Sequence, residues 1–261
     1  MVQSVASQPP AQFDCGIQFD ADWQPLNFCG VPNPFFYHSF ADDFDNAVDM
    51  TYGLWTVTSG GAGVSASIIA GDGGLLQLTS GTTGGFFISV QLAQATFTLP
   101  AQPKKMFFET AVTTTNAPAT ASFIVGVSAV DTTPFTAVPN GVYFSWVGGT
   151  GLTFNSSNAS VVTSVVIPPA AYTFAAPGQR LELGWALTRQ GDLLAYVDNQ
   201  LVGFIPQSNI GTTNGPKNAG AVARLTAPSL SASNMAPILA FNSTAVSQTI
   251  VFDFVQVQKE R

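Results

Sequence analysis

Residues 180–204 read RLELGWALTRQGDLLAYVDNQLVGF, and this stretch decides the fold class. Its runs of Leu, Val, Trp and Phe are separated by the steps Gln190-Gly191-Asp192 and Asp198-Asn199-Gln200. Because Gly, Asp and Asn tolerate positive φ angles, both steps are typical of tight hairpin turns. The stretch therefore predicts a meander of antiparallel strands at 180–188, 193–197 and 200–204.

The same pattern continues through most of the chain after residue 38. Short runs rich in Val, Ile, Phe and Thr alternate with clusters of Gly, Pro and Asn, which indicates a sandwich or barrel of many strands. The run at 123–127, FIVGV, is almost wholly apolar, as expected of a central strand covered on both faces. Residues 219–225 fit either a helical turn or a loop. The remaining strands are predicted at 54–58, 75–79, 85–92, 95–99, 106–114, 121–129, 141–147, 151–154, 161–167, 238–242 and 249–257.

Composition limits the size and class of the protein. A chain of 261 residues fits one large β domain with a short extension. Only 9% of the residues are charged and 46% are hydrophobic, which disfavours exposed amphipathic helices. Lys and Arg number 8 against 15 Asp and Glu, so no basic field attracts nucleic acid.

Hydropathy indicates a chain with an excess of apolar surface. The mean hydropathy is +0.27, yet no run of about 18 apolar residues occurs, so no membrane span is expected. Residues 1–10 have neither a basic nor a strongly apolar segment, so no cleaved signal peptide is predicted and synthesis in a cytoplasm is expected. The apolar excess is expected to face another protein chain.

Residues 1–38 are predicted to form an extended arm in front of a sandwich domain at 39–261. Prolines at 9, 10, 25, 32 and 34 exclude regular helix and central strand. Large apolar side chains distinguish the segment from a flexible linker, so we expect it to dock on its own sandwich or on a neighbouring subunit. Cys15 and Cys29 are either reduced thiols or one disulfide, and two cysteines alone do not make a four-ligand zinc site. The predicted interface residues of the arm are Phe13, Phe19, Trp23, Phe28, Phe35, Phe36 and Tyr37.

The meander also carries a resemblance to a known family. Residues 181–185, LELGW, followed by 191–202, GDLLAYVDNQLV, resemble the hairpin of concanavalin A-like lectin and glucanase jelly rolls. The resemblance covers residues 39–261 and implies an all-β fold: a concanavalin A-like jelly-roll β-sandwich with an extended N-terminal arm. Further similar segments are Asp42-Asp43-Phe44, Leu54-Trp55, 106–110, 123–127 and 251–257.

A second resemblance concerns function. A jelly roll of low charge that is rich in Thr, Ala and Gly and follows a proline-rich arm is similar to the tailed-phage virion proteins that decorate capsids. This implies a non-enzymatic structural protein, a capsid decoration or cement protein, on the virion surface. Its partners would be the major capsid protein and copies of itself, for example in a trimer, with no nucleic acid or membrane. Because a jelly roll hosts many functions, a carbohydrate-binding module of a virion fibre is the alternative, and a divergent polysaccharide-degrading enzyme is a third.

The residues that catalysis on this fold needs do not occur together in the sequence. Retaining glucanases need a nucleophile and an acid about 5 Å apart, which alternate positions of one strand provide. Here Glu109, Glu182 and Glu260 are widely separated, so no catalytic residue, cofactor or metal is predicted. His38 has no Ser or Cys arranged beside it for nucleophilic catalysis and is expected to be a plain arm or interface residue.

Other candidate residues have structural explanations. The densest acidic cluster lacks the spacing of an EF-hand and fits a solvated turn, with a cation site as the alternative. It consists of Asp42, Asp43, Asp45 and Asp49. Sugar binding would need exposed aromatic side chains, whereas aromatics on alternating strands are core residues by default. The aromatic candidates are Tyr143, Trp146, Trp185 and Tyr196.

Overall fold

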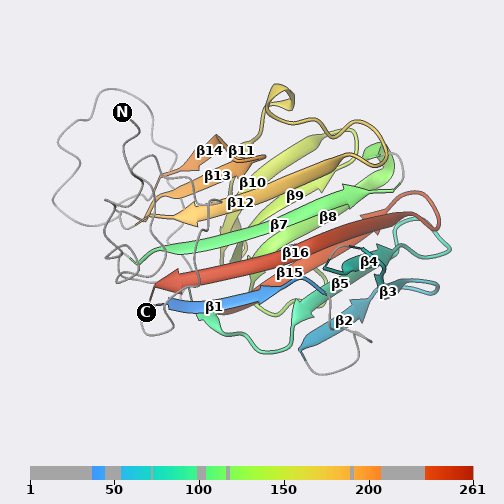
Figure 1. The fold of residues 1–261 in the computed structure, drawn as a ribbon, viewed down its shortest axis with the longest axis horizontal. Helices are drawn as coiled ribbons and strands as arrows, with labels where there is room; N and C mark the ends of the chain where they lie inside the picture. Colours follow the sequence, from blue (N-terminus) through green and yellow to red (C-terminus); the bar gives the residue numbers. More distant parts are fainter. Residues whose placement is uncertain are drawn as a thin grey trace, which may run out of the picture.

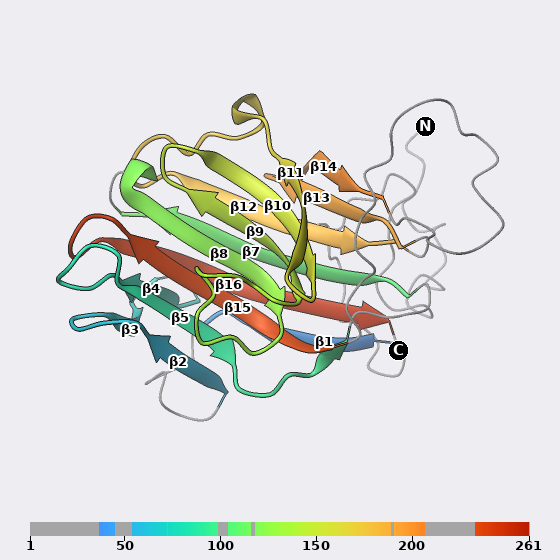
Figure 2. The same cartoon turned by 180° about the vertical axis from the view of Figure 1, so that it is seen from behind.

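The computed structural model describes residues 37–44, 54–71, 73–98, 104–115, 118–188, 191–206 and 233–260. In these ranges the chain folds into two antiparallel sheets that pack face to face as a jelly-roll β-sandwich (Figure 1, Figure 2). The only helical elements within them are two 3-10 turns, Pro118–Thr120 and Pro169–Ala171. No helix in the described part is long and apolar enough to cross a membrane.

The front sheet is the one nearer the viewer in Figure 1. Its strands lie in the order β14-β13-β12-β7-β16-β4-β3, and β1 also pairs with β16. The strand bounds are β14 Gln200–Ile205, β13 Leu193–Val197, β12 Arg180–Leu187, β7 Met106–Thr114, β16 Thr249–Glu260, β4 Leu75–Thr79, β3 Ser65–Ile69 and β1 Tyr37–Asp42.

The back sheet comes forward in Figure 2. Its strands lie in the order β11-β10-β9-β8-β15-β5-β2, and the two-residue strand β6 also pairs with β15. The strand bounds are β11 Val161–Val166, β10 Gly151–Asn158, β9 Gly141–Val147, β8 Ala121–Ser128, β15 Asn234–Ser243, β5 Phe87–Leu92, β2 Trp55–Ser59 and β6 Phe97–Thr98.

The structure confirms the predicted meander. Strands β12, β13 and β14 pair in succession, and the Asp198-Asn199 turn has positive φ angles of 47° and 66°. Strand β15 begins at Asn234 rather than at residue 238, so it includes a proline, Pro237. At Pro237 the strand pairs with β8 but not with β5, so the N–H that proline lacks is not needed for a hydrogen bond to β5. Sequence patterns do not reveal β1 or β3, and β1 starts at Tyr37, inside the range assigned to the arm.

Large apolar side chains from alternate strand positions fill the space between the sheets. On β7 the inward residues Phe108 and Val112 join this core, and the Phe108 ring stacks on Trp185 of β12 with a centroid distance of 6.1 Å. The largest fully buried side chains are Trp185, Phe44, Phe97, Phe108, Phe123, Phe144, Phe154, Phe241 and Phe252.

The outer face of the back sheet is partly covered by residues 129–140. Val138 and Phe135 of this loop pack on a cluster that includes Ile124 and Tyr143. Gln91 holds the loop in place, since its Nε2 donates to the Ala129 carbonyl at 3.1 Å and its Oε1 accepts from the Asp131 N–H at 3.0 Å. The strand at 121–128 is therefore buried on both faces, as its apolar sequence predicts.

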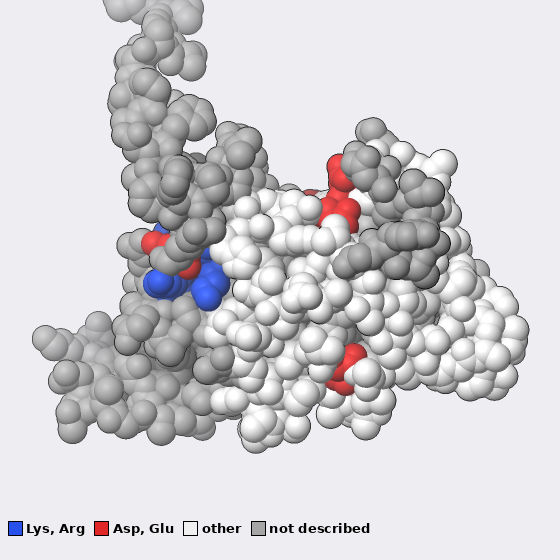
Figure 3. Space-filling view, turned by 90° about the horizontal axis from the view of Figure 1, so that it is seen from below, with Lys and Arg blue, Asp and Glu red and all other residues white. Residues whose placement is uncertain are grey.

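The surface has few charged groups. On the side shown in Figure 3, charged side chains occur in a few small groups, with the basic ones gathered at one end. The small number of charges makes their placement on the two sheets informative.

Candidate functional site

Charge is segregated between the two sheets. None of the back-sheet strands contains an Asp, Glu, Lys, Arg or His residue. The Asp, Glu, Lys, Arg and His residues on strands of the described part therefore all belong to the front sheet. Those near its middle lie on the outward positions of β7, β12 and β16, and we take this face as the candidate site.

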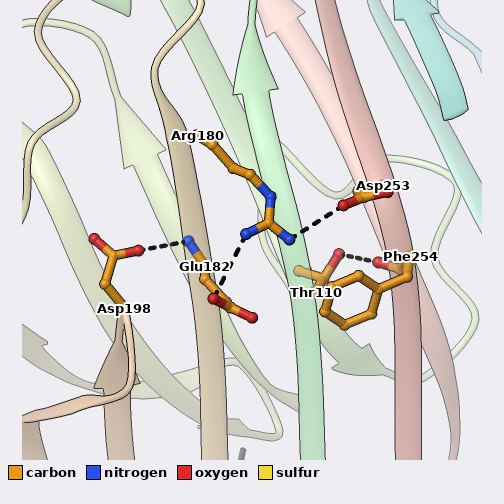
Figure 4. A network of polar contacts seen from close by, with 6 residues as sticks. All are labelled: Thr110, Arg180, Glu182, Asp198, Asp253 and Phe254. Carbon is orange, nitrogen blue, oxygen red and sulfur yellow. Dashed lines mark hydrogen bonds and ion pairs between the residues drawn. The ribbon is translucent and has the colours of Figure 1, made fainter. Parts of the chain in front are cut away.

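A row of polar contacts crosses the outer face of the front sheet (Figure 4). Arg180 reaches Glu182 on its own strand, with 3.6 Å between Nη1 and Oε2, and Asp253 on β16, with 3.1 Å between Nη2 and Oδ2. The N–H of Glu182 donates to Oδ1 of Asp198, in the turn after β13, at 3.0 Å. We call these residues, Arg180, Glu182, Asp198 and Asp253, the front-face row.

Local backbone features place the members of the row. Asp253 lies at an irregularity of β16, where the register against β7 shifts between Phe252 and Val255. Such bulges turn a side chain away from the regular alternation, and here the outcome is a carboxylate beside Arg180. Asp198 has a φ of 47°, which Asp tolerates better than most residues in a tight turn.

Glu109 lies beside the row and forms a carboxyl pair with Glu182. The β7–β12 register sets Gly184 opposite Glu109 and Ala111 opposite Glu182, so the two glutamates are diagonal neighbours on one face. Their side chains hydrogen-bond to each other, and Glu109 is only 6% exposed. Burial, the hydrogen bond to Glu182 and the charge of Glu182 together raise the pKa of Glu109 from 4.5 to about 8, while Arg180 acts in the opposite direction.

The expectation that the glutamates lie apart is therefore wrong for Glu109 and Glu182. The antiparallel pairing of β7 with β12 brings them together from distant parts of the chain. Two carboxyls in hydrogen-bond contact must share a proton, and Glu109 holds it at neutral pH. Direct contact is closer than the about 5 Å of retaining glycosidases and the 6.5–9.5 Å of inverting ones, so the pair does not match either arrangement.

Further outward positions extend this face on both sides of the carboxyl pair. Phe107, Ala186 and Tyr196 form a buried cluster of their own. Across β16, Gln256 lies opposite Glu109 and Gln258 lies opposite Phe107. Gln258 is 1% exposed, and neither its Oε1 nor its Nε2 has a hydrogen-bond partner, so it adds an unsatisfied buried amide next to the pair.

Asp42 has a structural role at the start of the sandwich. Its Oδ2 accepts the Trp55 indole N–H at 2.7 Å, and its Oδ1 accepts the Phe44 N–H at 2.8 Å. Of the other members of the predicted acidic cluster, Asp45 and Asp49 lie outside the described residues. Within the described ranges, no group of three or more His, Cys, Asp or Glu residues could hold a metal ion.

The predicted arm and its aromatics lie mostly outside the described residues. The residues that precede the first described position are Phe13, Phe19, Trp23, Phe28, Phe35, Phe36, Cys15 and Cys29. Residues 219–225, predicted as a helical turn or a loop, also lie outside the described residues, between 206 and 233. The backbone of Tyr37 pairs with Glu260 in β1. His38, the next residue, stacks on Phe97 with a centroid distance of 4.7 Å, which makes it a packing residue of the sheet.

The aromatic candidates for sugar contact are core residues, as expected from strand alternation. Trp146 and Trp185 point between the sheets, and the Trp146 indole N–H donates to the Pro118 carbonyl at 3.1 Å. Tyr143 and Tyr196 lie on the outer faces but are also buried. None of these rings is available as an exposed platform for a sugar.

Comparisons with known proteins define the fold. No protein-family profile matches the chain, and no curated protein matches it. The metal-free carbohydrate recognition domain of Emp46p is similar, with a TM-score of 0.52, 9% identity and coverage of 82% of this chain and 93% of that one. The globular domain of T. cruzi calreticulin has a TM-score of 0.51, 11% identity and coverage of 84% and 86%.

A protein of unknown function from Shewanella oneidensis MR-1 is similar to the same degree. Its TM-score is 0.51 at 10% identity, and the match covers 86% of each chain. Identities this low establish the fold and nothing further, so the chain has the lectin-like jelly-roll architecture that the meander predicts.

Proposed function

We propose that this protein is a non-enzymatic, lectin-like carbohydrate-binding protein whose front-face row contacts the sugar. The observation that carries the proposal is the row itself: Arg180, Glu182 and Asp253 are 47%, 22% and 38% exposed in their side chains and lie side by side on one sheet face. A similar fold in a carbohydrate recognition domain supports the choice of ligand class.

The chemistry of the row suits sugar hydroxyls. Carboxylate oxygens of Glu182 and Asp253 accept hydrogen bonds, and the guanidinium of Arg180 donates them in a fixed planar geometry. Neighbouring hydroxyls of a sugar ring offer donors and acceptors at matching spacing. A few such polar groups on a rigid sheet can fix the orientation of a ligand.

Carbohydrate cleavage is the less favoured use of this site. The carboxyl pair lies in hydrogen-bond contact, which leaves no room for a glycosidic bond between Glu109 and Glu182. We therefore expect binding without hydrolysis. A reducing-sugar release assay on every bound glycan tests this, and cleavage that disappears in Glu109→Gln or Glu182→Gln would support the enzyme instead.

A glycan array with purified full-length protein tests the proposed function. We expect binding to a defined class of glycans, and Arg180→Ala should weaken it at least about tenfold because charge-assisted hydrogen bonds are lost. Lys104→Ala is the matched control. It removes the same charge from the other end of β7, about 30 Å away at 3.3 Å per residue, and should leave binding unchanged.

Two outcomes would contradict the proposal. The first is the absence of binding to any glycan by folded protein. The second is glycan binding that Arg180→Ala and Lys104→Ala reduce equally, because that pattern would indicate general charge attraction rather than a site at the row.

The second candidate function is the virion structural protein, a capsid decoration or cement protein. What supports it is exposed apolar side chains on an uncharged strand, β11, where Val161 and Val166 are 62% and 68% exposed. The proposed partners are the major capsid protein and copies of the chain itself, at the capsid surface. High-resolution imaging of particles assembled with and without the protein tests this role, and particles that never incorporate the protein would exclude it.

A further inference from the structure

The outer face of the front sheet is covered at one end. Phe107 of β7 points away from the core, yet it is only 3% exposed. Its cross-strand neighbours on this face are Ala186 of β12 and Gln258 of β16. Side chains of this size beside a phenylalanine ring leave its outer surface open to water, as on any sheet face that nothing covers. A further segment of protein therefore lies over Phe107 in the folded state.

The covered area has clear limits. Tyr196 of β13 is 4% exposed, whereas Leu201, its partner on β14, is 58% exposed. On the other side, Ser39 of β1 lies opposite Gln258 and is exposed again. The cover thus spans the four strands β13, β12, β7 and β16, a width of about 15 Å at about 4.8 Å between neighbours. We call this area the covered end, and its residues are Phe107, Ala186, Tyr196 and Gln258.

The described residues do not supply this cover. The outer face of the front sheet is turned toward the viewer in Figure 1, and no described strand or loop crosses the covered end there. On the back sheet the cover is a described loop, residues 129–140, which packs over Tyr143 and Ala240. The ranges 99–103 and 189–190 adjoin the covered end but contain too few residues to cross four strands and return. The cover therefore comes from residues 1–36, from residues 207–232 or from another molecule.

Gln258 indicates what kind of segment lies there. Its side chain is 1% exposed, and neither Oε1 nor Nε2 has a hydrogen-bond partner. Burial of an amide without partners is costly, so the covering segment has to offer both a donor and an acceptor. An extended backbone offers both when its N–H and C=O groups are not used in a helix or a ladder. Residues 1–36 are of this kind, because their prolines exclude regular helix and central strand.

Residues 1–36 also join the sheet beside the covered end. The first described residue, Tyr37, pairs with Glu260, two positions from Gln258 on β16. Strands β1 and β7 lie on either side of β16, so Phe107 is about 10 Å from β1. A few extended residues, at about 3.3 Å each, are enough to reach it. The position of Tyr37 therefore places the covered end within easy reach of this segment.

Charge favours the same segment. Residues 1–36 contain three aspartates and no Lys or Arg, and the aspartates are Asp14, Asp20 and Asp22. The lysines of the described part all lie at the covered end of the sandwich, and the basic group stands out in Figure 3. They are Lys104, Lys105 and Lys259. Burial and the nearby charge of Lys104 lower the pKa of Lys259, which shows that positive charge is crowded there. An acidic segment relieves this crowding.

Residues 207–232 suit the covered end less well. They contain no aromatic residue, and they carry two positive charges of their own, Lys217 and Arg224. They also connect β14 of the front sheet with β15 of the back sheet, so both of their ends are fixed and one of them leads away from the outer face. Residues 1–36 have a single attachment and supply large apolar side chains.

We propose that residues 1–36 fold back over the covered end of their own subunit, with aromatic side chains on Phe107 and Tyr196 and backbone groups on the Gln258 amide. The attachment at Tyr37 keeps the segment at a high local concentration beside its site, which favours its own subunit over a neighbouring one. Arg180 is six residues from Ala186 along β12, about 20 Å, so the front-face row stays open. The proposal does not depend on glycan binding.

The first test uses hydroxyl-radical footprinting of the full-length chain, read by mass spectrometry. In one variant Phe13, Phe19, Trp23 and Phe28 are all replaced by Ser. Tyr196 should then be oxidised about tenfold faster than in wild type, because its exposed fraction rises from 4% toward the 58% of Leu201. Tyr143, buried on the other sheet under residues 129–140, is the internal control and should not change. The same four positions changed to Leu form the matched control, which should keep Tyr196 protected.

A second test measures the energetic coupling between the segment and the covered end. In the wild-type background, Ala186→Arg should lower the melting temperature on the order of 5 °C, because the arginine displaces the cover. In the four-serine variant the same change should have little effect, since position 186 then faces water. Ala240→Arg is the control, because Ala240 is equally buried but lies under residues 129–140. It should lower the melting temperature in both backgrounds.

Crosslinking of unmodified protein needs no mutation. A carbodiimide joins a carboxylate directly to a nearby ammonium group, so peptides that contain Asp14, Asp20 or Asp22 should be linked to Lys104, Lys105 or Lys259 within one chain. If the four-serine variant unfolds, Tyr143 is oxidised as well, and this experiment decides. The absence of such links in wild type would contradict the proposal.

Three further results would overturn it. One is a Tyr196 that stays protected in a folded four-serine variant. Another is protection of Tyr196 in wild type that disappears on dilution, because that result would assign the cover to a neighbouring copy. The third is protection lost when residues 207–232 are replaced by a Gly-Ser linker of the same length, which would assign it to that segment.

Discussion

Glu109 is the residue whose chemistry departs furthest from its ordinary behaviour. It lies in the middle of the front sheet, nearly buried, with its carboxyl hydrogen-bonded to that of Glu182. At neutral pH the protein keeps one proton there, so the pair carries one negative charge rather than two. A neutral carboxylic acid next to the front-face row can donate a hydrogen bond that a carboxylate cannot.

The stability of the protein should depend on pH through this residue. The folded state holds the Glu109 proton up to a pKa of about 8, whereas the unfolded chain releases it near 4.5. The contribution of the proton to stability is therefore complete below pH 4.5 and is lost as the pH rises to 8. In thermal melts, the free energy of unfolding of Glu109→Gln relative to that of wild type should rise across this pH range, by up to about 1.4 kcal/mol per pH unit.

Asp198→Asn is the control for this prediction, because it changes an exposed carboxyl near the same face. We expect its melts to follow the pH dependence of wild type. A Glu109→Gln variant whose difference from wild type is the same at pH 5 and pH 8 would show that Glu109 does not hold the proton.

Gly126 shows how closely two strands of the back sheet approach. A Cβ atom at this position would lie 2.3 Å from the Val142 carbonyl oxygen and 2.6 Å from the Tyr143 Cα, both of them backbone atoms of β9. Because neither strand can move freely within the sheet, Gly126→Ala should lower the free energy of unfolding by about 1–3 kcal/mol.

Chemical denaturation measures this loss. Ala121→Gly, at the start of the strand that holds Gly126, is the control, and it should lower the free energy of unfolding by less than Gly126→Ala does. Gly149→Ala is unsuitable as a control because Gly149 has a positive φ. Equal stability of Gly126→Ala and wild type would mean that the two strands are further apart than the structure indicates.

At the scale of the element, β1 pairs with part of one side of β16, the longest strand. It pairs with residues 255–260 of β16, while β4 pairs with residues 249–252 along the same side. β1 also brings Asp42 to the Trp55 indole and is followed by Phe44, which is fully buried. These contacts make residues 37–44 part of the sandwich.

Two truncations separate the contribution of β1 from that of the preceding segment. Deletion of residues 1–36 keeps all β1 contacts, and we expect one cooperative melt. Deletion of residues 1–44 removes Phe44, whose burial is worth about 1.5–3 kcal/mol, together with the β1 ladder. The second protein should melt on the order of 10 °C lower than the first, by circular dichroism. Equal melting of the two would contradict the structural role of β1.

At the scale of the whole molecule, the two sheets divide the chemistry between them. The front sheet holds the carboxyl pair and the front-face row, and the back-sheet strands of the described part hold no Asp, Glu, Lys, Arg or His. A protein built this way has one face suited to polar ligands and another suited to protein contact. The proposed glycan site lies on the front sheet.

The strand-dominated architecture gives a prediction for the intact protein. Since the described ranges contain only two 3-10 turns as helical structure, the far-UV circular dichroism spectrum should show less than about 15% helix. A spectrum with a larger helical fraction would contradict the prediction that the chain is β-structured throughout.

The sequence by itself determined the features that depend on neighbouring residues. The meander at 180–204 follows from turn residues between apolar runs, and the double burial of β8 follows from its unbroken apolar sequence. Only the tertiary structure decided that Glu109 meets Glu182. Strands β8 to β11 lie between β7 and β12 in the chain but belong to the back sheet, so β7 and β12 become neighbours through a crossover that no local pattern records. Local patterns specify strands and turns, because those depend on adjacent side chains and φ preferences, whereas the choice of strand partners depends on packing the whole core.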